Sequence, residues 1–330
     1  MRVLVENSTW NNIGDGFYQF SLYYMLKSVF ADADIAMLEG PIERAFRPRN
    51  FKDNAFKLNL IQEADLFVLS GPIMSVSFIE EYGGLIKKII ASGKKYCLLS
   101  VHGNGKAQKE NLDFLSRYSP VAFSSRDPQT YELYKDCCGK SLNGVCAASL
   151  VSKTCPVADI CESERYVTVS FYEAFEPPIE AGEDGAIHAP RKRIEKERHW
   201  KWMRHLEWMR RYPSDIDGVK IIRPVHDIGY KFSHLNFAKP NSFLSYNPLS
   251  YLSLYKQTEL TVSNRVHAVL PTLSFGNPAV YYGTTARNGV FERLGIDLRY
   301  GCEIRVPQAT LDKEFFVMTQ FLESSLGEHL

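Results

Sequence analysis

The sequence predicts an α/β fold with two Rossmann-like domains, each built on a parallel sheet, that face each other across a cleft. Short apolar runs alternate with helical stretches along both halves of the chain. Continuous apolar strands separated by helices are typical of a parallel sheet that is covered on both faces. A length of 330 residues also suits two domains of about 150 residues each better than a single core.

The boundary between the domains is expected inside residues 137–161, a stretch rich in Cys, Gly and Ala with little apolar periodicity. We assign residues 1–150 to an N-terminal Rossmann-like domain and residues 151–310 to a C-terminal one. The tail has the apolar spacing of an amphipathic helix, so residues 311–330 are predicted as a closing helix.

In the first half, apolar runs predict the strands and apolar residues at helical spacing predict the helices. The predicted strands are residues 2–5, 65–69, 96–101 and 121–124, with a weaker one at 35–38. The predicted helices are residues 16–30, 83–92, 108–117 and 128–135. In the first helix, Phe17, Phe20, Tyr24 and Val29 have the spacing of one buried stripe.

The same alternation restarts in the second half. The predicted strands are residues 165–171, 218–222 and 259–263, and the predicted helices are residues 195–212, 248–256 and 287–294. Residues 175–188 lie between the first strand and the first helix of this half. Two prolines and two glycines in that segment predict a loop.

The composition excludes several classes of protein. A net charge of +1 gives no electrostatic reason to expect nucleic acid as a partner. No apolar run approaches the roughly 20 residues of a membrane-spanning helix, and the N-terminus lacks a signal-peptide core. Seven cysteines without a Cys-x-x-Cys pair favour reduced thiols over a metal site. We therefore expect a cytoplasmic protein without a metal or a cofactor, and its oligomeric state stays open.

Residues 261–282 hold the densest group of candidate site residues. They predict a strand end, a polar turn, a helix of small residues and a second buried strand. Ser263 or Asn264 is a suitable N-cap for that helix, and Arg265 and His267 stand at its start. Ligands of open α/β sheets bind at this edge, and helix N-termini favour anions. A cation and an imidazole there predict a site for a small, strongly anionic substrate.

The turn after the first strand, residues 11–16, is expected at the same kind of edge. It includes Asn12, Gly14 and Asp15. Glycine there lets the backbone approach a ligand, and the helix start exposes amide groups. The alternative is that Asp15 only caps the helix. The turn matches neither a Gly-x-Gly-x-x-Gly fingerprint nor a P-loop, so classical dinucleotide chemistry is not expected.

Three later turns also follow strands of the first half. Ser70 and Gly71 are expected to line the cleft with backbone groups. His102 could contact a ligand, but we interpret it as an ordinary solvated loop histidine. Arg126 would point toward the same edge, just before a helix that starts at Asp127. From local sequence alone, a surface ion pair of Arg126 with Asp127 or another carboxylate is the favoured alternative.

Residues 191–211 combine many cationic residues with three tryptophans, Trp200, Trp202 and Trp208. A basic helix that bears tryptophans can lie on an anionic membrane surface. The alternative is a solvated face whose tryptophans pack on the domain.

Four blocks in order resemble the polysaccharide pyruvyltransferase family. The blocks are residues 12–15 with Asn-x-Gly-Asp, residues 65–71 with a strand and a glycine turn, residues 125–128 with Arg-Asp, and residues 261–278 with Arg-x-His-Ala and Phe-Gly-x-Pro. The last block is the most specific. The resemblance spans about residues 1–295 and is patchy between 137 and 258. It departs from the family at Pro72, which removes one backbone donor from the glycine turn.

The resemblance implies a GT-B-like arrangement and the transfer of pyruvate from phosphoenolpyruvate onto sugar hydroxyls as a ketal, with release of phosphate. The acceptor would be a glycan or glycolipid precursor of the cell envelope. Arg126 and Arg265 would clamp the donor from opposite domains, and His267 would move the protons. Because a bound trianion favours the imidazolium form, we expect substrate binding to ready His267 as the general acid.

Two other readings stay open. A GT-B glycosyltransferase that uses a nucleotide sugar would share the architecture, and a non-catalytic binding protein could keep the same fold. A lipid-linked acceptor would give residues 191–211 a role in peripheral contact with the inner face of the membrane.

Overall fold

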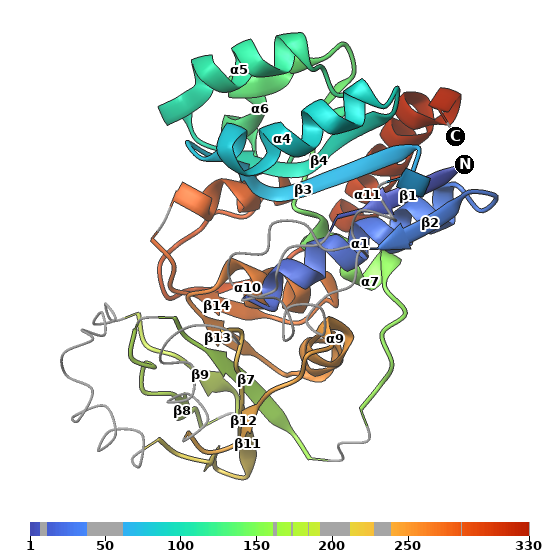
Figure 1. The fold of residues 1–330 in the computed structure, drawn as a ribbon. Helices are drawn as coiled ribbons and strands as arrows, with labels where there is room; N and C mark the ends of the chain where they lie inside the picture. Colours follow the sequence, from blue (N-terminus) through green and yellow to red (C-terminus); the bar gives the residue numbers. More distant parts are fainter. Residues whose placement is uncertain are drawn as a thin grey trace.

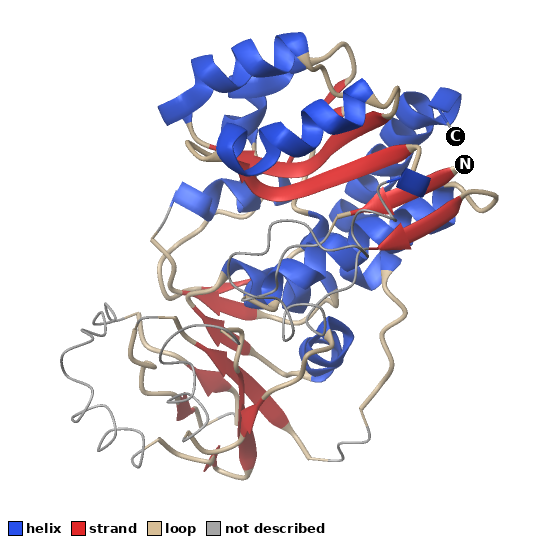
Figure 2. Ribbon diagram, viewed as in Figure 1, coloured by secondary structure: helices blue, strands red, loops and turns tan. Residues whose placement is uncertain are grey.

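The computed structural model describes residues 1–6, 12–37, 62–160, 164–172, 174–183, 185–191, 212–227, 239–284 and 286–329. It confirms the α/β fold with two Rossmann-like halves (Figures 1 and 2). The two main sheets lie toward opposite ends of the molecule in Figure 1. Helices α1 (Gly14–Val29) and α10 (Val266–Ser274) lie between them.

The N-terminal sheet consists, in the described part of the chain, of six parallel strands in the order β2-β1-β3-β4-β5-β6. The strands are β1 (Arg2–Val5), β2 (Asp34–Met37), β3 (Leu66–Met74), β4 (Lys95–Gly103), β5 (Phe123–Ser125) and β6 (Ser141–Asn143). All five predicted strands are confirmed. β6 was missed, because its Ser-Leu-Asn sequence contains no apolar run.

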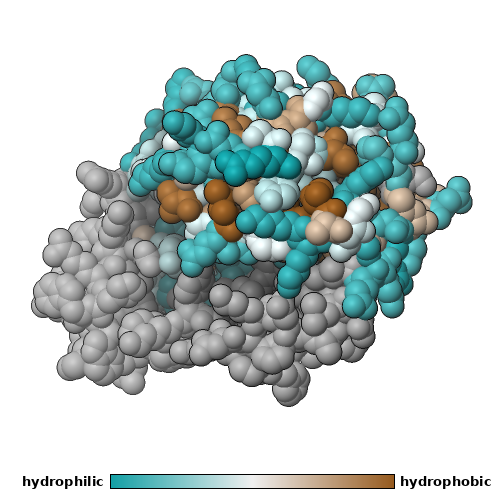
Figure 3. Space-filling view, turned by 45° about the horizontal axis from the view of Figure 1, so that its top comes forward, coloured by the Kyte–Doolittle hydropathy of each residue, from teal (hydrophilic) through white to brown (hydrophobic). Residues whose placement is uncertain are grey.

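Helices cover both faces of this sheet. α4 (Phe78–Ala91), α5 (Gln108–Arg117) and α6 (Pro128–Tyr134) lie on one side, and α1 lies on the other with α11 (Gln308–Leu326) (Figure 1). Neighbouring strand residues alternate between the two cores: Val3 and Val68 join the cluster of α1, whereas Leu4 joins that of α4. On the outer face shown in Figure 3, hydrophobic residues are scattered among hydrophilic ones.

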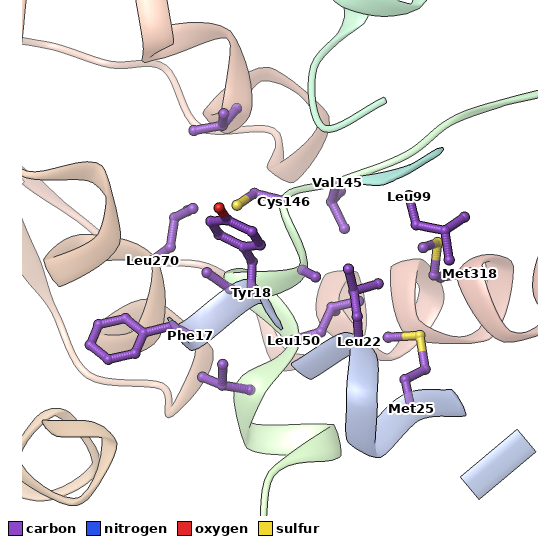
Figure 4. Packing of buried hydrophobic residues seen from close by; sticks show 14 of the residues in the cluster. Phe17, Tyr18, Leu22, Met25, Leu99, Val145, Cys146, Leu150, Leu270 and Met318 are labelled. Carbon is purple, nitrogen blue, oxygen red and sulfur yellow. The ribbon is translucent and has the colours of Figure 1, made fainter. Parts of the chain in front are cut away.

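The buried face of α1 differs from the predicted stripe. Phe17 is fully buried, but Phe20, Tyr24 and Val29 are only half-buried. The side chains that fill the core include Tyr18, Leu22 and Met25 (Figure 4). The stripe was misplaced because α1 is enclosed by several elements at once, among them α10 and α11, and therefore has no single buried side.

The C-terminal sheet has, among the described residues, seven strands in the order β10-β11-β7-β13-β14-β15, with β12 paired to β11. The strands are β7 (Tyr166–Ser170), β10 (Asp215–Ile216), β11 (Val219–Pro224), β12 (Ser242–Phe243), β13 (Thr261–Ser263), β14 (Ala279–Tyr281) and β15 (Glu303–Ile304). Its centre is parallel as predicted, and the edges add the antiparallel strands β10 and β15.

Other predicted elements of this half have mixed outcomes. Helix α9 (Pro248–Gln257) is confirmed, and η6 (Ala286–Leu294) is a 3₁₀ rather than an α-helix. The segment predicted as a loop contains a short antiparallel pair, β8 (Glu180–Ala181) and β9 (Ile187–His188). The helix predicted at 195–212 and its tryptophans lie outside the described residues, apart from residue 212.

The two halves are joined by one continuous buried cluster. The predicted closing helix is confirmed as α11, which packs beside α1 on the N-terminal sheet. Between α1 and α10 lie a short 3₁₀ turn, η3 (Ala147–Leu150), and α7 (Val151–Thr154). Among the described residues, no helix is long and apolar enough to cross a membrane.

Candidate functional site

The carboxyl ends of the two sheets approach each other at the start of α1. The Ile13 backbone amide donates a hydrogen bond to the His226 carbonyl at 2.9 Å, and Asn12 forms an isolated antiparallel bridge with Asp227. A Cβ on Gly14 would come within 2.7 Å of the His267 Cβ. Gly14 therefore permits close approach of the other half of the molecule, which lies at the position where a ligand was expected.

The predicted caps of α1 and α10 are wrong. α1 begins one residue before Asp15 without a side-chain cap, and Asn12 Oδ1 accepts from the Gly14 amide at 3.2 Å. The N-cap residue of α10 is Arg265, and Ser263 Oγ accepts its backbone amide at 2.9 Å. Both caps were misplaced because each helix starts at a different residue from the predicted one, which leaves the Asp15 side chain available to His267.

His267 lies in the first turn of α10 between an acid and a thiol. Its Nδ1 is 3.7 Å from Asp15 Oδ1, and its Nε2 is 3.7 Å from Cys146 Sγ. The ring also packs against Tyr18, with ring centroids 5.4 Å apart. The carboxylate favours an Nδ1 proton, so Nε2 faces the thiol side of the site.

Cys146 was missed by sequence reasoning, because it stands in the stretch that predicted only a domain crossing. Its sulfur and the Tyr18 hydroxyl lie close together in Figure 4. Burial raises the pKa of the Cys146 thiol, and the nearby Arg126 guanidinium opposes that shift. Burial likewise raises the pKa of Tyr18 well above its usual range. Both groups therefore stay protonated at neutral pH.

Arg126 is buried, with 3% of its surface exposed. Its backbone amide donates to the Val101 carbonyl at 2.9 Å, and its guanidinium lies near the Cys146 thiol. Its Nε has no hydrogen-bond partner, and no carboxylate of the described chain forms an ion pair with it. The alternative of a surface ion pair with Asp127 is wrong, because Asp127 binds His102 instead.

Arg265 is also nearly buried but differs in its partners. Its guanidinium forms an ion pair with Asp227 and lies over the Tyr172 ring, 4.8 Å from the centroid. Its Nε has no hydrogen-bond partner among the residues that the structure describes. Asn264 holds the Tyr172 backbone with two hydrogen bonds of 2.8 Å. Asp227 and Tyr172 were not predicted, because a sequence gives no sign of which residues a distant loop places beside an arginine.

His226 is a second imidazole that sequence reasoning missed. It is 1% exposed, its Nε2 is 2.6 Å from the Tyr255 hydroxyl, and its Nδ1 has no partner within the described part of the chain. Burial, Arg265 and His267 lower the pKa of His226 well below its usual range. The imidazole is therefore neutral, and it can accept or donate a hydrogen bond without adding charge to the site.

Ser70 and Gly71 do not form a turn after a strand, because β3 continues to Met74 across a bulge. Gly71 has a φ of +93°, and a Cβ there would overlap the Tyr18 hydroxyl. The glycine thus makes room for a protein side chain. Ser70 Oγ is buried without a hydrogen-bond partner.

The arrangement can hold an anion and move a proton. It combines an unpaired buried guanidinium, a second guanidinium with a shared carboxylate, and an imidazole between an acid and a thiol. Among the described residues, no three or more His, Cys, Asp or Glu side chains are grouped so that they could hold a metal ion.

A family model described as polysaccharide pyruvyl transferase matches residues 12–285, which include every candidate site residue named from the sequence. No curated protein matches the chain.

Solved structures share its fold at low identity. A protein from Listeria monocytogenes assigned as a UDP-N-acetylglucosamine 2-epimerase is 11% identical with a TM-score of 0.53, over 98% of this chain and 89% of that one. A co-structure of Staphylococcus aureus MnaA with UDP is 8% identical with a TM-score of 0.50, over 97% and 90%. These likenesses confirm the GT-B-like arrangement and carry no information on substrate.

Proposed function

The chain belongs to the polysaccharide pyruvyl transferase family and is therefore a transferase, and we propose that it moves pyruvate from phosphoenolpyruvate onto a saccharide. The pyruvate becomes a ketal on two hydroxyls of a glycan or glycolipid precursor, and phosphate is released. No cofactor takes part in this proposal.

The observation that carries the proposal is the guanidinium of Arg126, which is buried and has no ion-pair partner among the described residues. Burying a charge without a partner is costly, so such a group indicates a ligand of opposite charge. Phosphoenolpyruvate offers a phosphate and a carboxylate, both of which suit bidentate binding by arginine. Cys146 connects Arg126 to His267, so an anion bound at Arg126 would lie near the imidazole.

His267 supplies the proton in this scheme. As the first acceptor oxygen bonds to carbon 2 of phosphoenolpyruvate, the π electrons of the double bond take a proton from the imidazolium and form the methyl group. The carbon–oxygen bond to phosphate then breaks, and the second hydroxyl bonds to the same carbon. The proton that the first hydroxyl loses replaces, through solvent, the one that the imidazolium gave up, and the proton of the second hydroxyl leaves with the phosphate, so atoms and charges balance. Asp15 favours the imidazolium that the first step requires.

Arg265 completes the donor site with the N–H groups that Asp227 leaves unused. Its ion pair fixes the guanidinium before the donor arrives, which lowers the ordering cost of binding. The clamp from two halves of the molecule therefore consists of one unpaired and one pre-oriented arginine.

The acceptor binds beside Arg265 in this proposal. Tyr172 is 40% exposed, and its ring is held over Arg265 while Asn264 fixes its backbone. An exposed aromatic ring of fixed orientation offers an apolar face to a sugar ring and a hydroxyl to its polar groups.

The test is an assay of phosphate release from phosphoenolpyruvate against a panel of saccharide acceptors, including lipid-linked ones. We expect acceptor-dependent release by the wild type and a loss of about 10²–10⁴-fold in His267→Asn. Full turnover by that variant would remove His267 from the mechanism. Replacing Arg265 should raise the KM for phosphoenolpyruvate and lower the rate, and unchanged kinetics would contradict the clamp.

The same assay separates the other two readings. Nucleotide release from a nucleotide sugar, without phosphate release from phosphoenolpyruvate, would identify a glycosyltransferase. A binding protein on the same fold would show neither. If a lipid-linked acceptor is used, neutralising the cationic residues of 191–211 should weaken association with anionic vesicles, and unchanged association would exclude the peripheral contact.

A further inference from the structure

The end of β4 contains an unusual backbone conformation close to the site. Ser100 is fully buried and has a φ of +52°, although it is not a glycine. Such a conformation is costly and persists only where several contacts hold it. The Ser100 amide donates to Ser124 Oγ at 2.9 Å, and its hydroxyl donates to the Val145 carbonyl at 3.3 Å and accepts the Ala147 amide at 3.0 Å.

This conformation coincides with irregular pairing of β4 on both sides. The register shifts between Ser70 and Gly71 against β3, and between Leu98 and Val101 against β5. A bulge changes the direction of the side chains that follow it. A second shift against β3 falls between the pairs Gly71–Val101 and Met74–Gly103, so His102 lies inside the irregular end of β4.

His102 is paired with a carboxylate that is itself fixed. Its Nδ1 lies 2.8 Å from Asp127 Oδ2, and Thr130 donates to Asp127 through its amide at 2.8 Å and its hydroxyl at 2.9 Å. Burial alone would raise the pKa of Asp127, but the bonds from His102 and Thr130 outweigh it and the pKa lies below its usual range. The interpretation of His102 as an ordinary solvated histidine is therefore wrong.

The pairing leaves the other ring nitrogen available. With an Nδ1 proton donated to Asp127, Nε2 carries a lone pair and has no partner among the described residues. The side chain retains 15% exposure, so the nitrogen is not sealed in the core. Its carboxylate partner Asp127 directly follows Arg126, whose backbone amide bonds the Val101 carbonyl beside His102 and to which the proposed function assigns the donor anion.

We propose that His102 is the general base that accepts the proton of the attacking saccharide hydroxyl, with Asp127 as its positioning residue. The inference rests on the proposed function. It assigns removal of the hydroxyl proton to His102 and protonation of the methylene carbon to His267. The hydroxyl proton moves to His102 Nε2 while the oxygen bonds to carbon 2, and His267 gives its own proton to the methylene carbon. The His102 proton then returns to solvent and His267 is reprotonated from solvent, so the balance closes.

His102 is not needed to stabilise the start of α6. Asp127 already caps α6 through Thr130, without help from His102. His102 therefore adds little to the cap, whereas a carboxylate that orients an imidazole is the usual arrangement of a general base.

The test compares His102→Gln with the wild type in acceptor-dependent phosphate release across pH. We expect a rate loss of about 10²–10⁴-fold, binding of phosphoenolpyruvate within about twofold of the wild type by calorimetry, and loss of the acidic limb of the pH–rate profile. Free imidazole should restore part of the rate. His188→Gln, which changes an exposed histidine on β9, is the control and should keep the wild-type profile.

Asp127→Asn is the second variant, because asparagine keeps the cap but cannot favour the same imidazole tautomer. It should reproduce the lost acidic limb while the protein stays folded. A His102→Gln protein with the wild-type rate and profile overturns the inference, and so does one that fails to bind phosphoenolpyruvate. If the wild type itself releases no phosphate with any acceptor, the proposed function fails as well, so the two failures are distinguishable.

Discussion

The two arginines that follow β5 and β13 occupy matching positions in the two halves but have different surroundings. Arg126 has no carboxylate partner in the described chain and lies near a thiol. Arg265 is bound to Asp227 and stacked on Tyr172. Both guanidinium groups are largely removed from water.

The difference separates a binding residue from a pre-oriented one. A buried cation without a partner destabilises the empty protein, and an arriving anion relieves that cost. The charge of a paired cation is already balanced by its carboxylate. Such a cation therefore contributes less to the free energy of ligand binding, and its main effect is to orient the ligand. Arg126 should therefore dominate donor affinity, and Arg265 should dominate the geometry of the reaction.

Arg126→Met is the strongest test of this comparison. Removing the unpaired charge should weaken phosphoenolpyruvate binding by about 10³-fold or more, since the ligand loses a buried charge-assisted contact. The ligand-free variant should unfold at a higher temperature than the wild type, because the uncompensated charge is gone. Calorimetry and thermal unfolding measure the two effects. A variant with lower stability and unchanged affinity would show that Arg126 is structural.

Asp227→Asn tests the other arginine. Breaking a buried ion pair leaves Arg265 uncompensated and should lower the free energy of unfolding by about 3–5 kcal/mol, measured in urea. The change should couple strongly to Arg265→Met in a double-mutant cycle. Additive effects would mean that the pair contributes nothing beyond its separate side chains.

The sequence predicted the elements better than it predicted the contacts between them. The strands follow from apolar runs, and residues 261–282 correctly predicted that Arg265 and His267 stand at the start of a helix that follows a strand. Cys146, His226 and Asp227 could not be found this way, since they come from loops that only the docking of the two halves brings together.

Contacts between distant parts of the chain also explain why the roles of two glycines were predicted wrongly. Gly14 and Gly71 were expected to admit a ligand, but a Cβ at these positions would strike His267 and Tyr18. A glycine in a sequence can indicate that another group packs closely against the backbone, but it does not show whether that group is a ligand or a protein side chain.

The buried His226, which lies near the paired Arg265, gives a test that depends on pH. The pKa of His226 is lowered in the folded protein. Just below the usual histidine pKa, the imidazole is therefore protonated in the unfolded chain but neutral in the native state. Its contribution to stability is therefore present above the usual histidine pKa and is lost as the pH falls below it. Between pH 6.5 and 5.5 this loss should be about 1 kcal/mol. His226→Gln should lack it in urea unfolding at the two pH values, and an unchanged slope would mean that His226 is protonated in the native state.

Tyr172→Ala should have the smallest effect. Loss of the ring over Arg265 removes about 0.5–1 kcal/mol of cation–π attraction and the proposed sugar platform. We expect the KM for the acceptor to rise about threefold or more while phosphoenolpyruvate affinity changes less, as measured by steady-state phosphate release. A larger effect on the donor than on the acceptor would reverse the assignment. Tyr246→Ala, another exposed aromatic, is the matched control.

The central claim is that the site between the two sheets transfers pyruvate from phosphoenolpyruvate with a proton delivered by the protein. Mass spectrometry of the saccharide product formed in heavy water tests it most directly. The account predicts a pyruvate ketal that carries one solvent deuterium in its methyl group, one phosphate released per ketal, and at least about 10²-fold slower product formation with His267→Asn or Arg126→Met. Unmodified acceptors throughout the panel, or the same labelled ketal from both variants, would contradict it.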